Sequence, residues 1–411
     1  MNTSRRDFWK FLTGQTISVL GSAFSGFALP LLIFQLTHSP LSLAIATATF
    51  ALPHLLFGLF IGAWVDRVDR KRLMIAMDIL MAVALAVIPI LALVHHLNVL
   101  WIYAVQFTVS SLGLVFEQAE FTAIPSLVGD IDLVTANGRI NASYQASEVA
   151  GPTIAGAIAT VVSIPALLVI DAVSYLVSAT MLATIKVGFN RSTREAKRTT
   201  RILSDIGEGL RYVWSHPVLR NISLMMMLFN LVNSTFYAQS VYYAKERLHT
   251  SNFELGLFFA AGSVGAILFS LLAGKLRRRF SFSTVVIGCL ALSGVFTVIF
   301  ASIPWLWLAL PFLLLREGVL SLLNINTFSL RQAIVPDQML GRVLSVAGVL
   351  AFSAMPLGSI AGGILIERTH NVALVFGAIG VLLFLIPLAF SLTPLGHADR
   401  YLPASPKAPA T

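Results

Sequence analysis

Long apolar runs separated by short polar stretches extend along the chain from residue 11 to residue 392. Each run has about the 20 residues that an α-helix needs to cross a hydrocarbon core of roughly 30 Å. The pattern therefore predicts twelve membrane-spanning helices, which cover residues 11–36, 42–65, 73–94, 99–122, 139–162, 165–185, 218–244, 253–274, 281–302, 304–330, 342–366 and 371–392.

One long polar stretch, residues 186–217, separates the sixth predicted helix from the seventh. Within it, Ile202, Ile206, Leu210 and Val213 recur at a helical spacing, which is typical of an amphipathic helix on a membrane surface. We therefore predict an N-terminal six-helix bundle (1–186), a cytoplasmic linker with an amphipathic helix (187–217), a C-terminal six-helix bundle (218–394) and a disordered tail (395–411).

The composition agrees with a membrane protein, because 57% of the residues are hydrophobic and only 11% are charged. Soluble domains carry about 25% charged residues and cannot bury so much apolar surface. The single cysteine, Cys289, lies inside an apolar run, which excludes a disulfide framework. The sequence has no Walker A loop, metal-ligand cluster or nucleophile elbow, so we expect no cofactor and no enzymatic activity.

The basic residues predict the orientation in the membrane. All but four of the 28 Lys and Arg residues fall on one side if the N-terminus lies in the cytoplasm. Because cytoplasmic loops are enriched in these residues, we predict cytoplasmic termini and a multi-pass protein of the bacterial inner membrane. Topology and contact with anionic lipids then account for the net charge of +9, and nucleic acid is not expected as a partner.

The two predicted halves repeat the same features. In each half, a glycine near the end of the second helix precedes a basic loop, and a Gly-Arg pair precedes a proline in the fifth helix; these are Gly62 and Gly274, residues 138–139 and 341–342, and Pro152 and Pro356. Parallel repeats of this kind are typical of transporters that move two bundles around a central site. The prediction is an all-α membrane protein with twelve transmembrane helices in two pseudo-symmetric six-helix bundles.

Two motifs carry a resemblance to a known family. The segment Gly62-Ala-Trp-Val-Asp66-Arg67-Val-Asp-Arg70-Lys71-Arg72 resembles the loop signature of the major facilitator superfamily, with Asp69 where that signature usually has Gly. The run Gly151-Pro152-Thr-Ile-Ala-Gly156 is similar to the Gly-Pro motif of the superfamily's exporters. The resemblance covers nearly the whole chain and is strongest to the branch that holds the enterobactin exporter and macrolide efflux proteins. The fourth predicted helix departs from many proton antiporters, since it has no Arg-x-x-Gln-Gly pattern.

The resemblance implies gating roles for residues in the motifs. Gly62, Asp66, Arg67 and Arg70 are expected to latch the two halves, with Asp66 at the N-terminus of a helix in the other half. The basic residues of this loop are the expected partners of Glu117 and Glu120, at the end of the fourth helix. The alternative for the loop is a purely topogenic role.

A second set of gating candidates lies in the fifth and eleventh helices. Gly151 and Pro152 in one, and Pro356 in the other, are expected to form a hinge and seal between the halves, because proline removes a backbone hydrogen bond and small residues permit close packing. Ordinary small-residue packing is the alternative.

Ionisable residues inside the spans indicate the transport site, because a charge in the membrane is costly and usually faces a cavity or a partner. Glu148 lies near mid-membrane and, with Glu317, is predicted to carry protons; a Glu148 that only packs is the alternative. Arg316 and Glu317 are adjacent, so we expect them to point to different faces and not to pair. Asp171 is expected near the outer surface, exposed to water.

The resemblance places the first, fourth, seventh and tenth helices around the cavity. It thus implies a substrate cavity with Arg316, Asn230, Asn233, Tyr237 and Gln106. For Arg316, a structural ion pair is as plausible as contact with an anionic substrate group.

Taken together, these features predict a secondary active transporter that exports amphiphilic small molecules, such as drugs, macrolides or siderophore-like compounds, by alternating access and proton antiport. The expected partners are the small amphiphilic substrate, protons and membrane lipids, and a monomer is expected. One alternative is an importer or facilitator of a small metabolite. The alternative of another class is a non-transporting receptor or scaffold, which the costly charges in the spans argue against.

Overall fold

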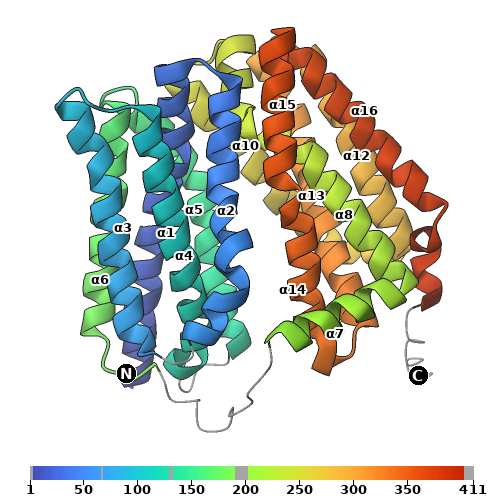
Figure 1. Cartoon of the computed structure of the whole chain (residues 1–411), viewed down its shortest axis with the longest axis horizontal. Helices are drawn as coiled ribbons and strands as arrows, with labels where there is room; N and C mark the ends of the chain where they lie inside the picture. The colour runs from blue at the N-terminus through green and yellow to red at the C-terminus, as the bar shows by residue number, and fades with distance from the viewer. Residues whose placement is uncertain (1–2, 66–67, 129–132, 190–201, 402–411) are drawn as a thin grey trace. The chain divides into compact units, whose positions relative to one another are not determined.

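The computed structural model describes residues 3–65, 68–128, 133–189 and 202–401. Throughout these residues the regular structure is helical and no strand occurs (Figure 1). The all-α fold predicted from the apolar runs is confirmed.

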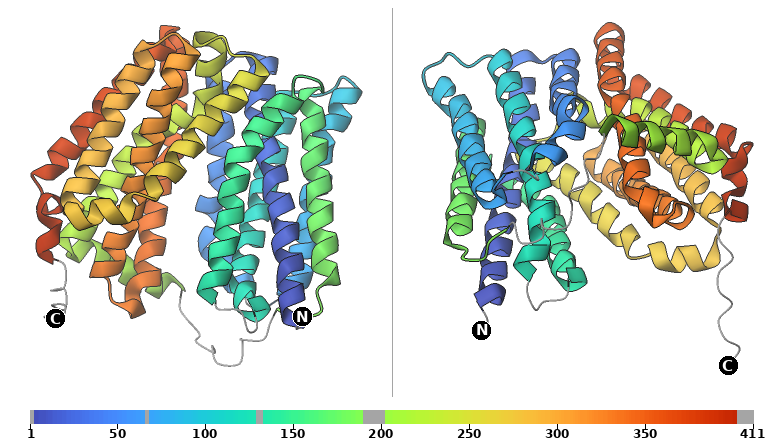
Figure 2. Two further views of the ribbon diagram at one scale, coloured as in Figure 1. Left: turned by 180° about the vertical axis from the view of Figure 1, so that it is seen from behind. Right: turned by 60° about the horizontal axis from the view of Figure 1, so that its bottom comes forward.

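The first half of the chain forms a bundle of long helices. They are α1 (Thr3–Thr37), α2 (Pro40–Val65), α3 (Arg70–Leu93), α4 (Val99–Val128), α5 (Leu133–Ile158) and α6 (Ile164–Thr184). Figures 1 and 2 show these helices side by side, with α1 packed against α5 and α6, α3 against α4 and α6, and α2 against α4.

The second half begins with the amphipathic helix α7 (Ile202–Ser215). It continues with α8 (Pro217–Ala238), the short helix α9 (Ser240–Tyr242), the π-helical turn η1 (Tyr243–Arg247), α10 (Asn252–Ser270), α11 (Ala273–Arg279), α12 (Phe282–Ser302), α13 (Leu306–Ile334), α14 (Asp337–Ser353), α15 (Met355–Thr369), α16 (Val372–Ser391) and the 3₁₀ helix η2 (Pro394–Tyr401).

Ten helical segments in the described ranges are long and apolar enough to cross a membrane, with α14 and α15 counted as one. The other two predicted spans, 139–162 and 218–244, coincide with α5 and α8. These two helices carry more polar side chains, among them Asn141, Gln145 and Glu148 in α5 and Asn230 and Asn233 in α8. Both helices therefore lie where the sequence predicts spans, but their hydropathy is lower than that of the other ten.

The contacts group the chain into two compact units. The first contains residues 1–199, 238–263 and 359–370, and the second contains residues 200–237, 264–358 and 371–411. The first unit thus adds the beginning of α10 and the end of α15 to the six helices predicted for the N-terminal bundle. This addition reflects direct packing of α10 on α5 and of α15 on α2.

Glycine permits the contact between α5 and α10. A Cβ atom on Gly156 would lie 2.7 Å from the carbonyl oxygen of Asn252 and 2.9 Å from Cα of Gly256, which is too close for any side chain. The amide of Asn252 also donates to the carbonyl of Ala159 at 3.2 Å. Within the first unit, therefore, the two helix backbones meet directly.

Proline interrupts the helix that the sequence predicts over 342–366. The helix α14 ends at Ser353 and α15 begins at Met355, one residue before Pro356. The break has a simple cause, since proline lacks the N–H that would continue the helical hydrogen bonds. By contrast, α5 runs through Pro152 as one helix.

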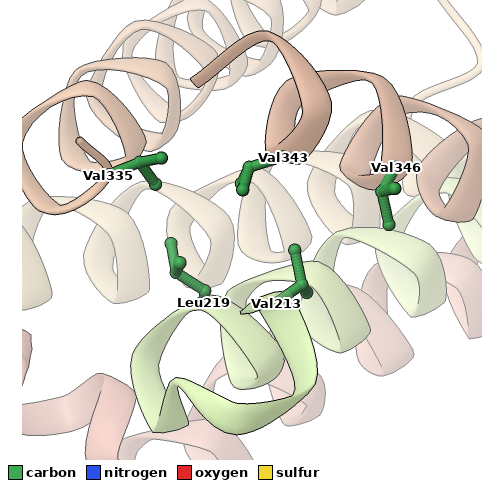
Figure 3. Close-up of a cluster of buried hydrophobic side chains, with 5 residues drawn as sticks. All are labelled: Val213, Leu219, Val335, Val343 and Val346. Carbon is green, nitrogen blue, oxygen red and sulfur yellow. The ribbon is translucent and has the colours of Figure 1, made fainter. Parts of the chain in front are cut away.

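The predicted amphipathic helix is present as α7, and it belongs to the second unit. Val213 of α7 packs in a buried cluster with Leu219 of α8, Val335 at the end of α13, and Val343 and Val346 of α14 (Figure 3). Glu208 of α7 also forms an ion pair with Arg342 of α14. Part of the apolar face of α7 is thus packed on protein, while Leu210 and Trp214 are exposed.

The start of the predicted disordered tail is folded instead, since η2 extends to Tyr401. Leu395 and Ala398 are fully buried, and Asp399 accepts hydrogen bonds from the backbone N–H groups of Phe282 and Ser283 at 3.0 and 3.2 Å. The prediction missed this helix because the segment is rich in proline and polar residues, and its two buried apolar residues, Leu395 and Ala398, are too few to form a recognisable pattern. Residues 402–411 lie outside the described residues.

Candidate transport site

A cavity of about 500 Å³ lies inside the first unit. Residues of α1, α2, α3, α4 and α6 form its wall, and most of the wall surface is apolar, with contributions from Leu29, Phe50, Met81 and Leu114. A volume of this size with a mainly apolar wall suits a drug-sized organic molecule.

A few polar groups converge on this cavity. Glu117 and Gln106 reach it from α4, His54 from α2, and Asp171 and Tyr175 from α6. Glu117 is exposed, and the side-chain oxygen of Gln106 is buried without a hydrogen-bond partner in the described structure. None of the residues that form this wall is Lys or Arg. Two carboxyl groups in an apolar wall favour a cationic ligand over an anionic one.

Asp171 is fully buried, which corrects the prediction that it is exposed to water. The hydroxyl of Ser25 on α1 donates to one carboxyl oxygen, and that of Ser174 donates to the other at 3.2 Å. The close approach of α1 explains the burial, because a Cβ atom on Gly21 would lie 2.8 Å from a carboxyl oxygen of Asp171. The sequence puts Asp171 near one end of α6, but its exposure depends on the packing of α1 against α6, which the sequence does not show.

Arg316 and Glu317 form an ion pair in the second unit, so the prediction that they do not pair is wrong. The guanidinium has no exposed surface, and it also donates to Asn233 and, at 3.0 Å, to the hydroxyl of Thr297. Spacing along a helix constrains Cβ positions, whereas the long Arg side chain folds back to reach its neighbour.

The same network includes two aromatic residues of α8. The guanidinium carbon of Arg316 lies 3.5 Å from the ring centre of Phe236, and the hydroxyl of Tyr237 donates to Glu317 at 2.9 Å. Asn230 lies on the same helix, one turn before Asn233, and is half-buried. The structure thus brings Arg316, Asn233, Tyr237 and Glu317 together, while Gln106 belongs to the cavity of the first unit.

Glu148 and Glu120 differ in their surroundings. Glu148 is exposed on α5, and its backbone carbonyl accepts a hydrogen bond from Ser263 at 3.3 Å. Glu120 is buried and accepts a hydrogen bond from Tyr144. The expected partner of Glu120 was the basic loop, but its observed partner is a neighbouring helix of the same bundle.

The loop signature lies partly outside the described residues, which exclude Asp66 and Arg67. Gly62 is part of α2. Arg70 is buried and donates to the carbonyl oxygens of Thr122 and Phe189, both at 3.3 Å. These contacts join the start of α3 to the last part of α4 and to the segment that follows α6.

The Gly-Pro motif lies in a close contact between helices. A Cβ atom on Gly151 would collide with the side chain of Ala23 on α1, and the carbonyl of Pro152 would lie 2.6 Å from a Cβ atom on Gly256 of α10. The motif therefore packs α5 against two helices at once.

Sequence reasoning missed the polar contacts between α1 and α6. Gln15, Ser18, Ser22 and Ser25 recur every three or four residues along α1, a spacing that puts them on one face. This pattern was visible in the sequence, but small hydroxyl residues are common in membrane helices and give a weak signal. Among the described residues, no group of three or more His, Cys, Asp or Glu could hold a metal ion.

Comparison with known proteins adds independent information. A sequence model described as transmembrane secretion effector matches residues 4–409. The multidrug efflux pump Tap of Mycolicibacterium fortuitum is 29% identical over 88% of this chain and 90% of its own length. Macrolide efflux protein A of Streptococcus pyogenes is 26% identical over 89% of this chain and 91% of its own.

Solved structures show the same fold. A bacterial homologue of the iron transporter ferroportin superposes with a TM-score of 0.76 at 19% identity, over 94% of this chain and 99% of its own. A bacterial homologue of the human lysosomal transporter Spinster has a TM-score of 0.76 at 14% identity, over the full length of both chains. At such identities the likeness concerns the fold alone.

Proposed function

Since the chain belongs to the transmembrane secretion effector family of the major facilitator superfamily, we propose that it exports amphiphilic small molecules by alternating access. It is a multi-pass membrane transporter of the efflux branch. The relatives named as multidrug and macrolide efflux proteins support drugs and macrolides as substrates. Siderophore-like compounds belong to the same proposal.

The cavity of the first unit is the observation on which this proposal mainly rests. Its apolar wall accepts the hydrophobic part of a substrate, and the exposed carboxyl of Glu117 meets a cationic group. Gln106 adds a polar atom that a ligand can satisfy. An amphiphilic amine has this combination of an apolar body and one positive charge.

Alternating access requires contacts that close one side of the transporter and later separate. The glycine contact of α5 with α10 is suited to this role, because bare backbones pack without interlocking side chains. A second contact of this kind joins α15 to α2, where a Cβ atom on Gly363 would lie 2.7 Å from Cβ of Ala44. Gly151, Pro152 and Pro356 are the proposed hinge and seal residues.

Proton antiport is the proposed driving force, with Glu148 and Glu317 as proton carriers. Glu148 is exposed on α5 and can exchange a proton with water, whereas Glu317 exchanges one only if its contact with Arg316 loosens. The loop residues Gly62, Asp66, Arg67 and Arg70, together with Glu117 and Glu120, are proposed to control opening. We further propose a monomer in the bacterial inner membrane, with both termini cytoplasmic and anionic lipids around its basic loops.

Drug susceptibility and dye efflux test this function. The full chain is expressed in a bacterium without its major efflux pumps, and resistance to erythromycin and efflux of ethidium are compared with an empty vector. Wild type is expected to increase both, and Glu117→Gln to reduce ethidium efflux because the cation loses its counter-charge. Accumulation of the dyes instead of efflux would favour an importer, and no change at equal expression would contradict transport of these classes.

A further inference from the structure

Asp78 of α3 is a buried carboxyl group whose favourable polar neighbour is the hydroxyl of Ser178 on α6. Its side chain has no exposed surface, and no hydrogen bond of good geometry reaches either oxygen in the described structure. An unpaired ionised carboxylate in such a place costs several kcal/mol, because nothing replaces its lost hydration. The position therefore accommodates Asp78 in its neutral, protonated form.

Polar side chains connect this group to the cavity along the interface of α1 and α6. At one end, Ser178 faces Asp78 and accepts a hydrogen bond from Gln15 at 3.2 Å, which leaves the Ser178 hydroxyl proton free to turn toward Asp78. One turn along α6, Tyr175 lies within electrostatic reach of both Asp78 and Asp171. Its hydroxyl contacts Ser22 at 2.9 Å.

At the other end, Asp171 lies in the wall of the cavity although it has no exposed surface. Ser25 also lies in that wall and donates to Asp171, so the hydroxyl of Ser25 connects the carboxyl group to the cavity. Asp171 and Ser178 are seven residues apart on one helix, which corresponds to about 10 Å. Separate pairs of polar side chains from α1 and α6 thus lie at intervals between the two carboxyl groups, in a row that we call the α1–α6 seam.

From this geometry we propose that Asp78 and Asp171 are two proton-binding sites of the first unit, joined by the hydroxyl groups of the α1–α6 seam. The inference rests on the proposed proton antiport and assigns carriers beyond Glu148 and Glu317. Asp78 stores the proton away from the cavity, and Asp171 exchanges it with the cavity through Ser25.

The transfer is balanced in charge. A proton leaves the carboxyl group of Asp78 and arrives on the carboxylate of Asp171, while each hydroxyl on the way accepts one proton and passes on another. The pair keeps one proton and one negative charge throughout. A cationic substrate in the cavity favours the ionised form of Asp171 and so drives its proton out, which couples substrate binding to proton release.

The charged and titratable groups around the pair come from several helices. They are His54 of α2, Glu117 and Glu120 of α4, Tyr144 of α5 and Tyr175 of α6. Glu117 faces the cavity and His54, and Glu120 is itself acidic and hydrogen-bonded to Tyr144, so neither offers Asp78 a positive charge. A purely structural, ionised carboxyl group would be expected to have a cationic partner.

Asn substitutions in the purified full-length protein test the proposal. Asp78→Asn and Asp171→Asn keep the shape of each side chain but cannot bind a proton, and Tyr175→Phe removes one hydroxyl of the seam. Glu246→Gln, at an exposed carboxyl group of η1, is the matched control. Each variant is reconstituted into liposomes, and ethidium transport is measured with and without a pH gradient.

Asp78→Asn is expected to lose uphill transport driven by the pH gradient and to keep downhill ethidium exchange, because it does not touch the cavity. Asp171→Asn is expected to lose ethidium-induced proton release, and Tyr175→Phe to slow it. The control should behave as wild type. Infrared difference spectra between ethidium-bound and ethidium-free protein should show a carboxylic acid band that wild type loses on binding and that is absent in Asp78→Asn; a structural Asp78 that stays protonated gives no such difference band.

The outcomes separate this inference from the proposed function. If wild type transports ethidium but Asp78→Asn keeps full gradient-driven transport and the same infrared band, the assignment of Asp78 and the seam is wrong. If wild type transports neither ethidium nor erythromycin, the proposed function fails, and the inference fails with it.

Discussion

Arg316 has a guanidinium group with five N–H donors in a place that water does not reach. Glu317, Asn233 and Thr297 accept from it, and the ring of Phe236 lies over its positive charge. These partners come from α13, α8 and α12. At this residue the described contacts support a structural role, which ties three helices of the second unit together.

Arg316→Ala is therefore expected to destabilise the protein. The change removes the cation that Glu317 and Asn233 face, and removal of one partner from a buried charge pair costs about 3–5 kcal/mol. The melting temperature of the detergent-purified variant should fall well below that of wild type. Arg368→Ala, at an exposed position, should leave it unchanged. Equal melting temperatures for wild type and Arg316→Ala would refute the structural role.

Helix contacts in the first unit depend on the absence of side chains at a few positions. A Cβ atom on Gly256 would lie 2.6 Å from the carbonyl of Pro152 and 3.2 Å from Cα of Gly156. Gly377 of α16 is different, since a Cβ atom there has no neighbour within 4 Å. Two glycines in helices long and apolar enough to cross a membrane thus differ in the space that a side chain would find.

Alanine substitution should separate these two positions. Gly256→Ala is expected to push α5 and α10 apart at a cost of about 1–3 kcal/mol and to reduce ethidium efflux, because the proposed seal no longer closes. Gly377→Ala should stabilise by about 0.5–1 kcal/mol, since alanine favours the helix. Efflux assays and thermal melts on both variants check this. Unchanged efflux in Gly256→Ala would exclude a tight seal at that contact.

The carboxyl group of Asp399 helps to hold η2 against the start of α12. Burial pushes the pKa of Asp399 upward, but hydrogen bonds from the backbone of Phe282 and Ser283 and the charge of Arg277 outweigh it. The pKa of Asp399 therefore lies below its usual value of 3.8. Arg277 lies 3.7 Å from Asp399, across the start of α12.

A lowered pKa in the folded state makes this contact dependent on pH. The stabilisation by Asp399 is complete above about pH 5 and declines as the pH falls through the folded-state pKa, where the carboxylate takes up a proton. Asp399→Asn should thus melt below wild type at pH 7, and the difference should shrink below about pH 4. Melting curves over this range provide the measurement, and a difference that grows at low pH would contradict the proposed anchor.

At the scale of the whole molecule, transport must connect substrate and proton movements. Glu148 is exposed and has no side-chain hydrogen bond among the described contacts, whereas Glu317 is held by Arg316 and Tyr237. Glu148→Gln is therefore expected to weaken pH-gradient-driven efflux directly. Glu317→Gln should do so mainly by disturbing the Arg316 network, with a lower melting temperature.

Proteoliposomes with an imposed pH gradient measure the first effect, and thermal melts measure the second. If both variants export ethidium as well as wild type at every gradient, neither carboxyl group carries the coupling proton. A loss of transport in Glu317→Gln at an unchanged melting temperature would indicate a direct role for that residue instead.

Hydropathy and spacing along the chain were enough to predict the number and places of the long helices and the helix α7, and the two motifs carried the resemblance to the family. These properties depend on local sequence, because a span needs only enough apolar residues and a helix only its periodicity. The basic loops and the Gly-Pro motif are also local features, because each is recognised from a few neighbouring residues alone.

The pairing of Arg316 with Glu317, the burial of Asp171 and the cavity inside the first unit depended on helix packing. Lipid tails are as apolar as a protein core, so hydropathy does not distinguish the side of a helix that faces lipid from the side that faces other helices. A serine or aspartate in such a helix becomes a surface group or a buried partner according to what packs against it. The seam between Gln15 and Asp171 exists only because α1 and α6 meet at Gly21.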